Sequence, residues 1–232
     1  MHLFDGHNDL LYRMWQCGTG PAHDGAMARG LASVDGHLDL TRASAAGFTG
    51  GLFALFIPNS AAGEELSGGQ PPSYEDASVI CADMLALADE MVARFGDNIA
   101  KCLTVSDILA AQDASKIAMV LHIEGAEMIS ADCHEIEMLY QRGIRSLGPL
   151  WSRPNLFGEG VPLQFPGSPD QGDGLSDAGK RLVRTCNHYG IMLDLSHLNE
   201  KGFWDIAKLS DKPLVATHSN VHRLCPSPRN LT

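Results

Sequence analysis

Short runs of apolar residues recur along the chain, and several are apolar at almost every position. Such runs are typical of parallel strands that are covered on both faces, whereas a half-exposed strand alternates apolar and polar residues. The pattern predicts six strands, at residues 2–7, 47–58, 117–126, 144–151, 190–197 and 213–220.

Helical spacing of apolar residues appears between these runs, most clearly at residues 73–96. One apolar stripe there is made by Ile80, Met84, Leu87, Met91 and Phe95. Ser73 can cap the start of this helix, and Gly96 can end it. Similar patterns predict helices near residues 134–142, from Ser176 to just before Gly190, and from Asn199 to about Leu209.

Strands that alternate with helices form βα units, and these predict an α/β protein with a parallel sheet. A (β/α)8 TIM barrel needs eight strands and typically about 250 residues. The chain has 232 residues and six predicted strands, so about six βα units are present. We therefore expect residues 1–232 to form a single barrel domain that ends before strands seven and eight, either as a fragment or as a truncated product.

Two predicted connections are long, at residues 58–72 and 152–174. Long connections in compact domains are usually functional or disordered. Both follow the carboxyl ends of predicted strands, which is the face of a barrel where active sites lie.

Composition narrows the function classes further. A formal net charge of −11 disfavours a nucleic-acid or anionic membrane surface, because both need clustered lysine and arginine. No apolar run approaches the roughly 18 residues that a membrane span needs. The six cysteines are scattered without CxxC spacing, which is typical of reduced thiols, and no signal segment opens the chain. These features predict a cytoplasmic protein.

Metal-compatible side chains stand at the ends of four predicted strands: His7 and Asp9, Glu124, His197, and His218. His7 and Asp9 are two residues apart, so they point to the same side of a strand. Imidazole nitrogens and carboxylate oxygens suit zinc and similar divalent ions. Five such groups are enough for two ions if one carboxylate bridges them. The natural allocation places His7 and Asp9 on one ion, His197 and His218 on the other, and Glu124 between them.

Each of these residues also has a structural interpretation. A histidine at a strand end is more often a hydrogen-bonded structural residue, HxD occurs by chance, and Glu124 could cap the next helix. His122 lies two residues before Glu124, and we interpret it as a core residue or a neighbour of the ligands. The metal hypothesis is favoured because four separate strands place such groups on one face.

Four segments together carry a resemblance to a known family: DGHNDLL, HIEGAE, GLSDAGKRLVRTCNHYGIMLDLSHLNEKGFWDI and PLVATHSNVHRLCPSPRNLT. Combined, they resemble the membrane dipeptidase (renal dipeptidase) family of zinc peptidases, which belongs to the amidohydrolase-type barrels. The resemblance extends over essentially the whole chain. It implies a metal-dependent hydrolase barrel with two zinc ions, in which His7 and Asp9 match the ligands of the first ion, Glu124 the bridging ligand, and His197 and His218 the ligands of the second.

The resemblance also implies two substrate-binding residues. Arg229 matches the family arginine that binds the terminal carboxylate of the substrate, a role that suits a planar, permanently charged guanidinium. Trp151 stands where the characterised animal enzymes carry a histidine. An indole N–H can donate a hydrogen bond but cannot shuttle a proton, so we expect altered specificity rather than lost activity. Trp151 could equally be a packing residue.

One functional residue of the family falls outside this chain. The aspartate that handles the proton of the leaving amine follows strand eight, which would lie beyond Thr232, so we assign no catalytic residue within residues 1–232.

The resulting prediction is a binuclear zinc dipeptidase in which a metal-bridging hydroxide attacks the peptide bond of a dipeptide, including one with a D-residue at the C-terminal position. Alternatives are another amidohydrolase, such as an N-acyl-D-amino-acid deacylase or a β-lactam hydrolase, and a non-catalytic metal-binding remnant of such an enzyme. The expected partner is a small peptide substrate, with no nucleic acid and no membrane. A homodimer stays open, because members of the family often dimerise.

Overall fold

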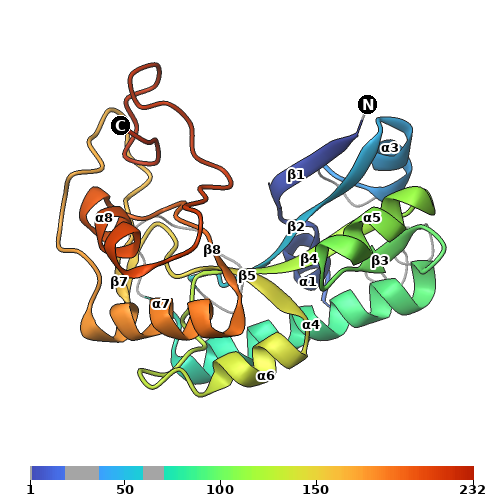
Figure 1. Cartoon of the computed structure of the whole chain (residues 1–232), viewed down its shortest axis with the longest axis horizontal. Coiled ribbons are helices and arrows are strands. Elements are labelled where there is room, and N and C mark those ends of the chain that lie inside the picture. Colours follow the sequence, from blue (N-terminus) through green and yellow to red (C-terminus); the bar gives the residue numbers. More distant parts are fainter. Residues whose placement is uncertain (1, 19–36, 60–70) are drawn as a thin grey trace. The chain divides into compact units, whose positions relative to one another are not determined.

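The computed structural model describes residues 2–18, 37–59 and 71–232. The described chain divides into two compact units. Unit 1 comprises Met1–Phe56 and Cys81–His122, and unit 2 comprises Ile57–Ile80 and Ile123–Thr232. Both units mix helices with strands (Figure 1).

Unit 1 is built on parallel strands. They are β1 (Leu3–Asn8), β2 (Phe48–Phe56), β3 (Ile99–Lys101) and β4 (Ile117–Glu124), of which the last two residues belong to unit 2. Strand β2 lies between β1 and β4, and β3 also pairs with β4. The registers align Phe4 with Gly50 and Ile99 with Ile117. Strand β4 is buried along its whole length, as its unbroken apolar run predicts.

The helices of unit 1 pack on this sheet. They are α1 (Leu10–Gln16), α3 (Leu40–Ala45), most of α4 (Tyr74–Phe95) and α5 (Val105–Asp113). Helices α1, α3 and α5 all contact β2 (Figure 1). Helix α5 begins with a capping box, in which Thr104 and Asp107 each accept a hydrogen bond from the other's backbone N–H.

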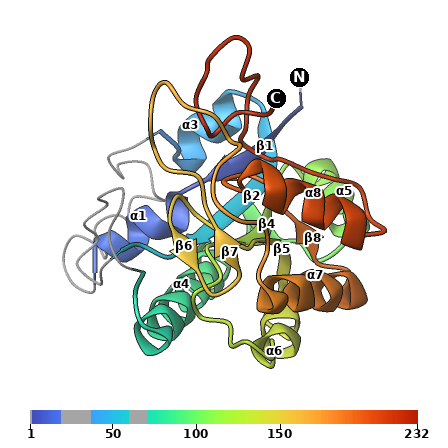
Figure 2. The same cartoon turned by 90° about the vertical axis from the view of Figure 1, so that its left-hand side faces the viewer.

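Unit 2 contains the parallel pair β5 (Ile144–Gly148) and β8 (Met192–Leu193), in which Ser146 aligns with Met192. A short antiparallel hairpin joins β6 (Pro154–Asn155) to β7 (Gly158–Glu159). The helices are α6 (Glu135–Gln141), α7 (Asp177–Tyr189) and α8 (Glu200–Leu209). Helix α7 contacts both α6 and α8 (Figure 2).

Both ends of α7 lie where the sequence predicts them. The Ser176 hydroxyl accepts a hydrogen bond from the Gly179 N–H, and Gly190 ends the helix in the left-handed conformation with φ of 71°. Leu182, Val183 and Cys186 are buried and form the inward face of the helix.

One predicted strand is absent, and another is much shorter than predicted, because β8 covers only Met192–Leu193 of residues 190–197. Residues 213–220 form no regular strand, and only Val215 makes a bridge, to Asp194. Two backbone N–H groups of this segment bond to side chains and not to a neighbouring strand. The Thr217 N–H donates to the Asp194 carboxylate, and the His218 N–H donates to the Ser196 hydroxyl. Conversely, β3 was not predicted, since its three residues are too short to give a clear pattern.

The predictions about the long connections, membrane spans, cellular location and domain organisation have different outcomes. The 152–174 connection contains the β6–β7 hairpin, whereas most of the 58–72 connection lies outside the described residues. None of the helices among the described residues combines the length and apolar character needed to cross a membrane. The cytoplasmic location and the single barrel domain over residues 1–232 stay predictions.

Candidate metal centre

The carboxyl end of β4 carries Glu124 into the interior of unit 2. The Ile57 N–H donates to the Glu124 carbonyl at 3.2 Å, and the Gly125 N–H donates to the Gly148 carbonyl at 3.1 Å. Gly125 has φ of +88°, and a Cβ there would lie 2.6 Å from the Glu127 carboxylate. Glycine is therefore required directly after Glu124, which is itself 4% exposed.

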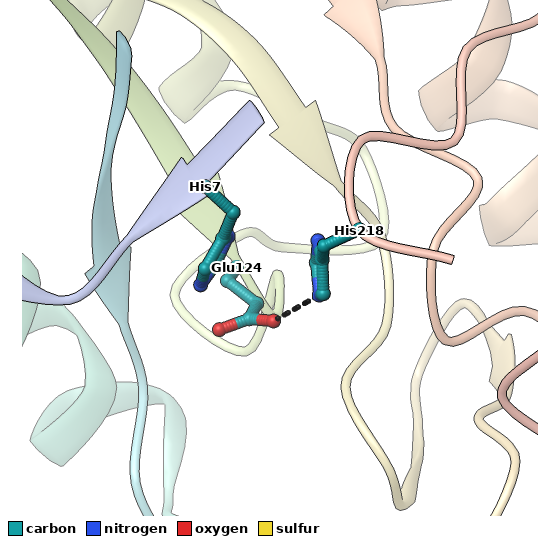
Figure 3. Close-up of side chains that lie close together, drawn as sticks. All are labelled: His7, Glu124 and His218. Atoms are coloured by element: carbon teal, nitrogen blue, oxygen red, sulfur yellow. Dashed lines mark ion pairs between the residues drawn. The ribbon is translucent and has the colours of Figure 1, made fainter. Parts of the chain in front are cut away.

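Two histidines meet this carboxylate within unit 2. Glu124 Oε1 lies 2.9 Å from His197 Nε2 and 3.2 Å from His218 Nε2, the latter drawn in Figure 3. The two Nε2 atoms are 3.0 Å apart. Three ligand atoms from segments far apart in the sequence thus converge on one point.

This donor set fits a divalent metal ion. In a tetrahedral zinc site with bonds of about 2.0–2.1 Å, two ligand atoms lie about 3.3 Å apart. The three observed separations, from 2.9 to 3.2 Å, are close to that value. One carboxylate oxygen and two imidazole nitrogens are also ligand types that zinc accepts.

Hydroxyl groups contact the opposite nitrogen of each ring. His218 Nδ1 lies 2.8 Å from Thr217 Oγ1, and the Thr217 hydroxyl donates to Asp194 at 2.6 Å. Because that hydroxyl has a single hydrogen, it must accept from His218 Nδ1–H, and in the neutral form of the ring the lone pair then stands on Nε2. Ser152 Oγ lies 2.8 Å from His197 Nδ1. Such partners orient histidine ligands in metal sites.

Burial keeps His197 in the form that a ligand needs. Removal from water lowers the pKa of His197 to about 4, although the neighbouring Glu124 carboxylate acts in the opposite direction. At neutral pH the ring is therefore uncharged and can offer a lone pair to a metal ion.

His7 and Asp9 form a pair within unit 1. His7 Nε2 lies 3.2 Å from Asp9 Oδ1, so the two side chains meet as their spacing predicts. Asp9 is the N-cap residue of α1 but makes no capping hydrogen bond with its side chain, which is about half exposed. His122 is fully buried and packs edge-on to the His7 ring at 5.7 Å between centroids.

Arg229 keeps one side of its guanidinium available in unit 2. Nη2 donates to the His218 carbonyl at 3.4 Å, while Nη1 is buried and has no hydrogen-bond partner among the described residues. Burial lowers the pKa of Arg229, against the attraction of Glu124 and Asp194. A buried, unsatisfied donor beside the histidines suits an anionic ligand.

Trp151 lies beside His197 in unit 2. The side chain is buried, and its ring centroid lies 6.0 Å from that of His197 at an angle of 39°. The central carbon of the Arg153 guanidinium lies over the Trp151 ring, 5.2 Å from the ring centroid.

Sequence reasoning missed the residues that support the ligands, namely Ser152, Arg153, Asp194 and Thr217. Two of them stand close to predicted ligands in the sequence, Asp194 in DLSH and Thr217 in ATHS. A hydroxyl or carboxylate next to a ligand histidine is the signal that could have indicated them.

Comparison with known proteins places this arrangement in a family. The family model described as membrane dipeptidase (peptidase family M19) matches residues 1–232. An uncharacterised protein from the PQQ-III 3′ region of Acinetobacter calcoaceticus is 41% identical over 241 residues, which cover 99% of this chain and 74% of that protein.

Solved structures agree. A metallopeptidase from Rhodobacter sphaeroides, liganded with a phosphinate mimic of the dipeptide L-Ala-D-Ala, has a TM-score of 0.90 at 42% identity, with 100% of this chain and 68% of that chain covered. A second structure, a dipeptidase described as a metallopeptidase of family M19, has a TM-score of 0.89 at 43% identity, with 100% and 67% covered. The predicted α/β fold of the metal-dependent hydrolase type is confirmed by these matches. The chain belongs to the membrane dipeptidase family, peptidase family M19, a family of metallopeptidases.

Proposed function

We propose that this protein is a binuclear zinc dipeptidase, which hydrolyses dipeptides and accepts a D-residue at the C-terminal position. The observation that carries the proposal is the convergence of Glu124, His197 and His218 in unit 2, next to the unsatisfied guanidinium of Arg229. Metal ligands beside a carboxylate-binding group are what hydrolysis of a very short peptide requires.

The proposed ligand sets follow the family resemblance. His7 and Asp9 would hold one zinc ion, His197 and His218 the other, and Glu124 both. When bound, the two ions would supply a water molecule of lowered pKa and would polarise the substrate carbonyl. The close approach of His7 Nε2 and Asp9 Oδ1 in unit 1 supports the first set, because both atoms can face one ion.

Arg229 would grip the terminal carboxylate of the substrate. Its buried Nη1 carries N–H donors without a hydrogen-bond partner among the described residues. A charge-assisted hydrogen bond in a site without water is stronger than the same bond in water. The anchor would set the distance from the carboxylate to the peptide bond and so restrict the enzyme to very short substrates. Trp151 would wall the pocket beside His197.

The acceptance of a D-residue is supported by a relative. The Rhodobacter sphaeroides metallopeptidase, 42% identical, was solved with a phosphinate mimic of L-Ala-D-Ala. The resemblance assigns the proton of the leaving amine to an aspartate at the end of strand eight of the family barrel, and none of residues 1–232 is proposed for that step. A small peptide is the proposed partner, and a homodimer stays a prediction.

The decisive experiment combines metal analysis with a substrate panel on the purified protein. We expect two zinc ions per chain and hydrolysis of L-Ala-D-Ala or L-Ala-L-Ala, which a chelator abolishes and zinc restores. Less than one zinc ion per chain, with no dipeptide hydrolysis after zinc addition, would contradict the proposal.

The same panel separates the alternatives. Faster turnover of N-acetyl-D-Ala than of any dipeptide would indicate a deacylase, and opening of a penicillin ring alone would indicate a β-lactam hydrolase. Two bound zinc ions without turnover of any of these compounds would indicate a non-catalytic metal-binding protein.

A further inference from the structure

Ser152 and His197 form a buried hydrogen bond that the proposed chemistry does not yet use. Ser152 Oγ lies 2.8 Å from His197 Nδ1, and the two residues are 3% and 5% exposed. The opposite nitrogen, Nε2, is the one that faces Glu124 and His218. The hydroxyl therefore contacts the ring on the side away from the candidate metal centre.

A neutral imidazole carries its proton on one nitrogen only. If Nε2 offers its lone pair to a metal ion, the proton must be on Nδ1, where the acceptor in reach is Ser152 Oγ. The His218 ring is held in the same way, because Thr217 accepts from its Nδ1–H and donates to Asp194. Each histidine thus has its own hydroxyl partner, and the two partners come from different segments.

The loop that carries Ser152 is fixed by the side chain of the next residue. The next residue, Arg153, is fully buried, and its guanidinium donates to Glu127 at 2.9 Å, to Asn59 at 3.0 Å and to the Ile57 carbonyl at 2.5 Å. Two segments of unit 2, residues 57–59 and the turn that carries Glu127, therefore hold the loop on which Ser152 stands.

The residues directly after the β6–β7 hairpin bond to the backbones on both sides of this contact. The Gly160 N–H donates to the Arg153 carbonyl at 3.2 Å, and the Val161 N–H donates to the His197 carbonyl at 2.8 Å. His197 itself has φ of 68°, in the left-handed region that residues other than glycine rarely adopt. The surrounding contacts thus fix both the backbone of His197 and the hydroxyl against its ring.

We propose that Ser152 is a positioning residue, which accepts a hydrogen bond from His197 Nδ1 and thereby directs Nε2 to the metal ion that His197 and His218 share. This inference rests on the proposed metal centre and assigns a residue to it. Without the hydroxyl, the Nδ1–H would be buried without a partner, and the ring would turn or change tautomer.

The test compares Ser152→Ala and Ser152→Thr with the wild-type protein. Zinc affinities of both sites are measured by competition with a chelator, and cobalt is substituted for zinc to record the absorption spectrum. We expect Ser152→Ala to bind one of the two ions about 10- to 100-fold more weakly, with an altered cobalt spectrum, and to bind the other ion as before. Ser152→Thr keeps the hydroxyl and should recover most of the affinity.

Thr185→Ala is the matched control, because it removes a hydroxyl from α7 that donates to the Arg181 carbonyl, away from the candidate metal centre. It should leave both affinities unchanged. A general loss of structure in Ser152→Ala would weaken both sites equally and would not be reversed by threonine, and that result would overturn the positioning role. Equal affinities in Ser152→Ala and wild type would overturn it as well.

Failure of the proposed function would look different. A wild-type protein that binds two metal ions but hydrolyses no dipeptide would contradict the dipeptidase proposal, while the comparison of metal affinities would still decide the role of Ser152.

Discussion

Single residues of unit 2 show how strongly the candidate centre depends on burial. His197, Glu124 and Ser152 are each at most 5% exposed, so their polar atoms have to be satisfied by one another or by a bound ion. The two Nε2 atoms and Glu124 Oε1 are all acceptors when both Nδ1 atoms carry their protons. Acceptors within 3.2 Å of one another repel unless a cation lies among them.

Glu124 is the residue whose charge matters most in this arrangement. Glu124→Gln keeps the size of the side chain but removes the negative charge, so we expect the protein to lose at least one of the two proposed zinc ions. Elemental analysis after gel filtration measures the zinc content per chain. Glu137→Gln changes an exposed residue of α6 and should keep the wild-type content. Retention of both ions in Glu124→Gln would show that Glu124 is not the shared ligand.

Arg229 makes a prediction about substrate binding. Arg229→Met removes the guanidinium, and a hydrogen bond to a charged group contributes about 1.5–3 kcal/mol, so KM for L-Ala-D-Ala should rise about 10- to 150-fold. Steady-state kinetics measure this. The C-terminally amidated dipeptide lacks the carboxylate and should distinguish poorly between wild type and variant. Arg223→Met, at an exposed position, is the control. An unchanged KM for the free dipeptide would remove Arg229 from the substrate site.

Elements of unit 2 carry their own start and stop signals, and this is why they were predicted well. Helix α7 lies between the Ser176 cap and Gly190, and α8 begins after Asn199, whose side chain accepts from the Gly202 N–H. The segment after α8 lacks such signals. Its Thr217 and His218 N–H groups bond to side chains, so a strand-like apolar run becomes an irregular segment that presents a ligand.

Gly190 tests this account of α7. A Cβ at Gly190 would meet nothing within 4 Å, so a substitution there is opposed only by φ of +71°. Gly190→Ala should therefore destabilise the protein by about 1 kcal/mol in urea unfolding. Gly190→Asn should cost less, because asparagine tolerates the left-handed conformation better. Equal stability of Gly190→Ala and wild type would contradict the assigned role of this glycine.

At the scale of the whole molecule, the buried histidine links folding to pH. His197 has a pKa of about 4 in the folded protein and about 6.5 when unfolded, so the unfolded chain binds the proton more tightly between these values. The stability of the metal-free protein should therefore fall as the pH drops from 6.5 to 4, by up to about 3 kcal/mol from this residue.

Urea unfolding of the chelator-treated protein across this pH range measures the effect. His197→Asn removes the titrating ring and should give a flatter pH dependence, and His134→Asn, at an exposed position, should keep the wild-type slope. Identical slopes in His197→Asn and wild type would contradict the burial account.

The sequence by itself determined the α/β class, the main helices with their caps, and the strands β1 and β4, which carry His7 and Glu124 near their carboxyl ends. These follow from local patterns, because apolar periodicity, caps and strand alternation act over a few neighbouring residues. The missed strand β3 has only three residues, which is too few for such a pattern to show.

Only the tertiary structure decided which groups support those ligands. Ser152 meets His197 across 45 positions of sequence, and Arg153 meets Asn59 across 94. The unsatisfied Nη1 of Arg229 likewise becomes visible only when burial and hydrogen bonds are known. Contacts of this kind depend on how distant segments pack, and no local pattern encodes the partner of a buried hydroxyl or guanidinium.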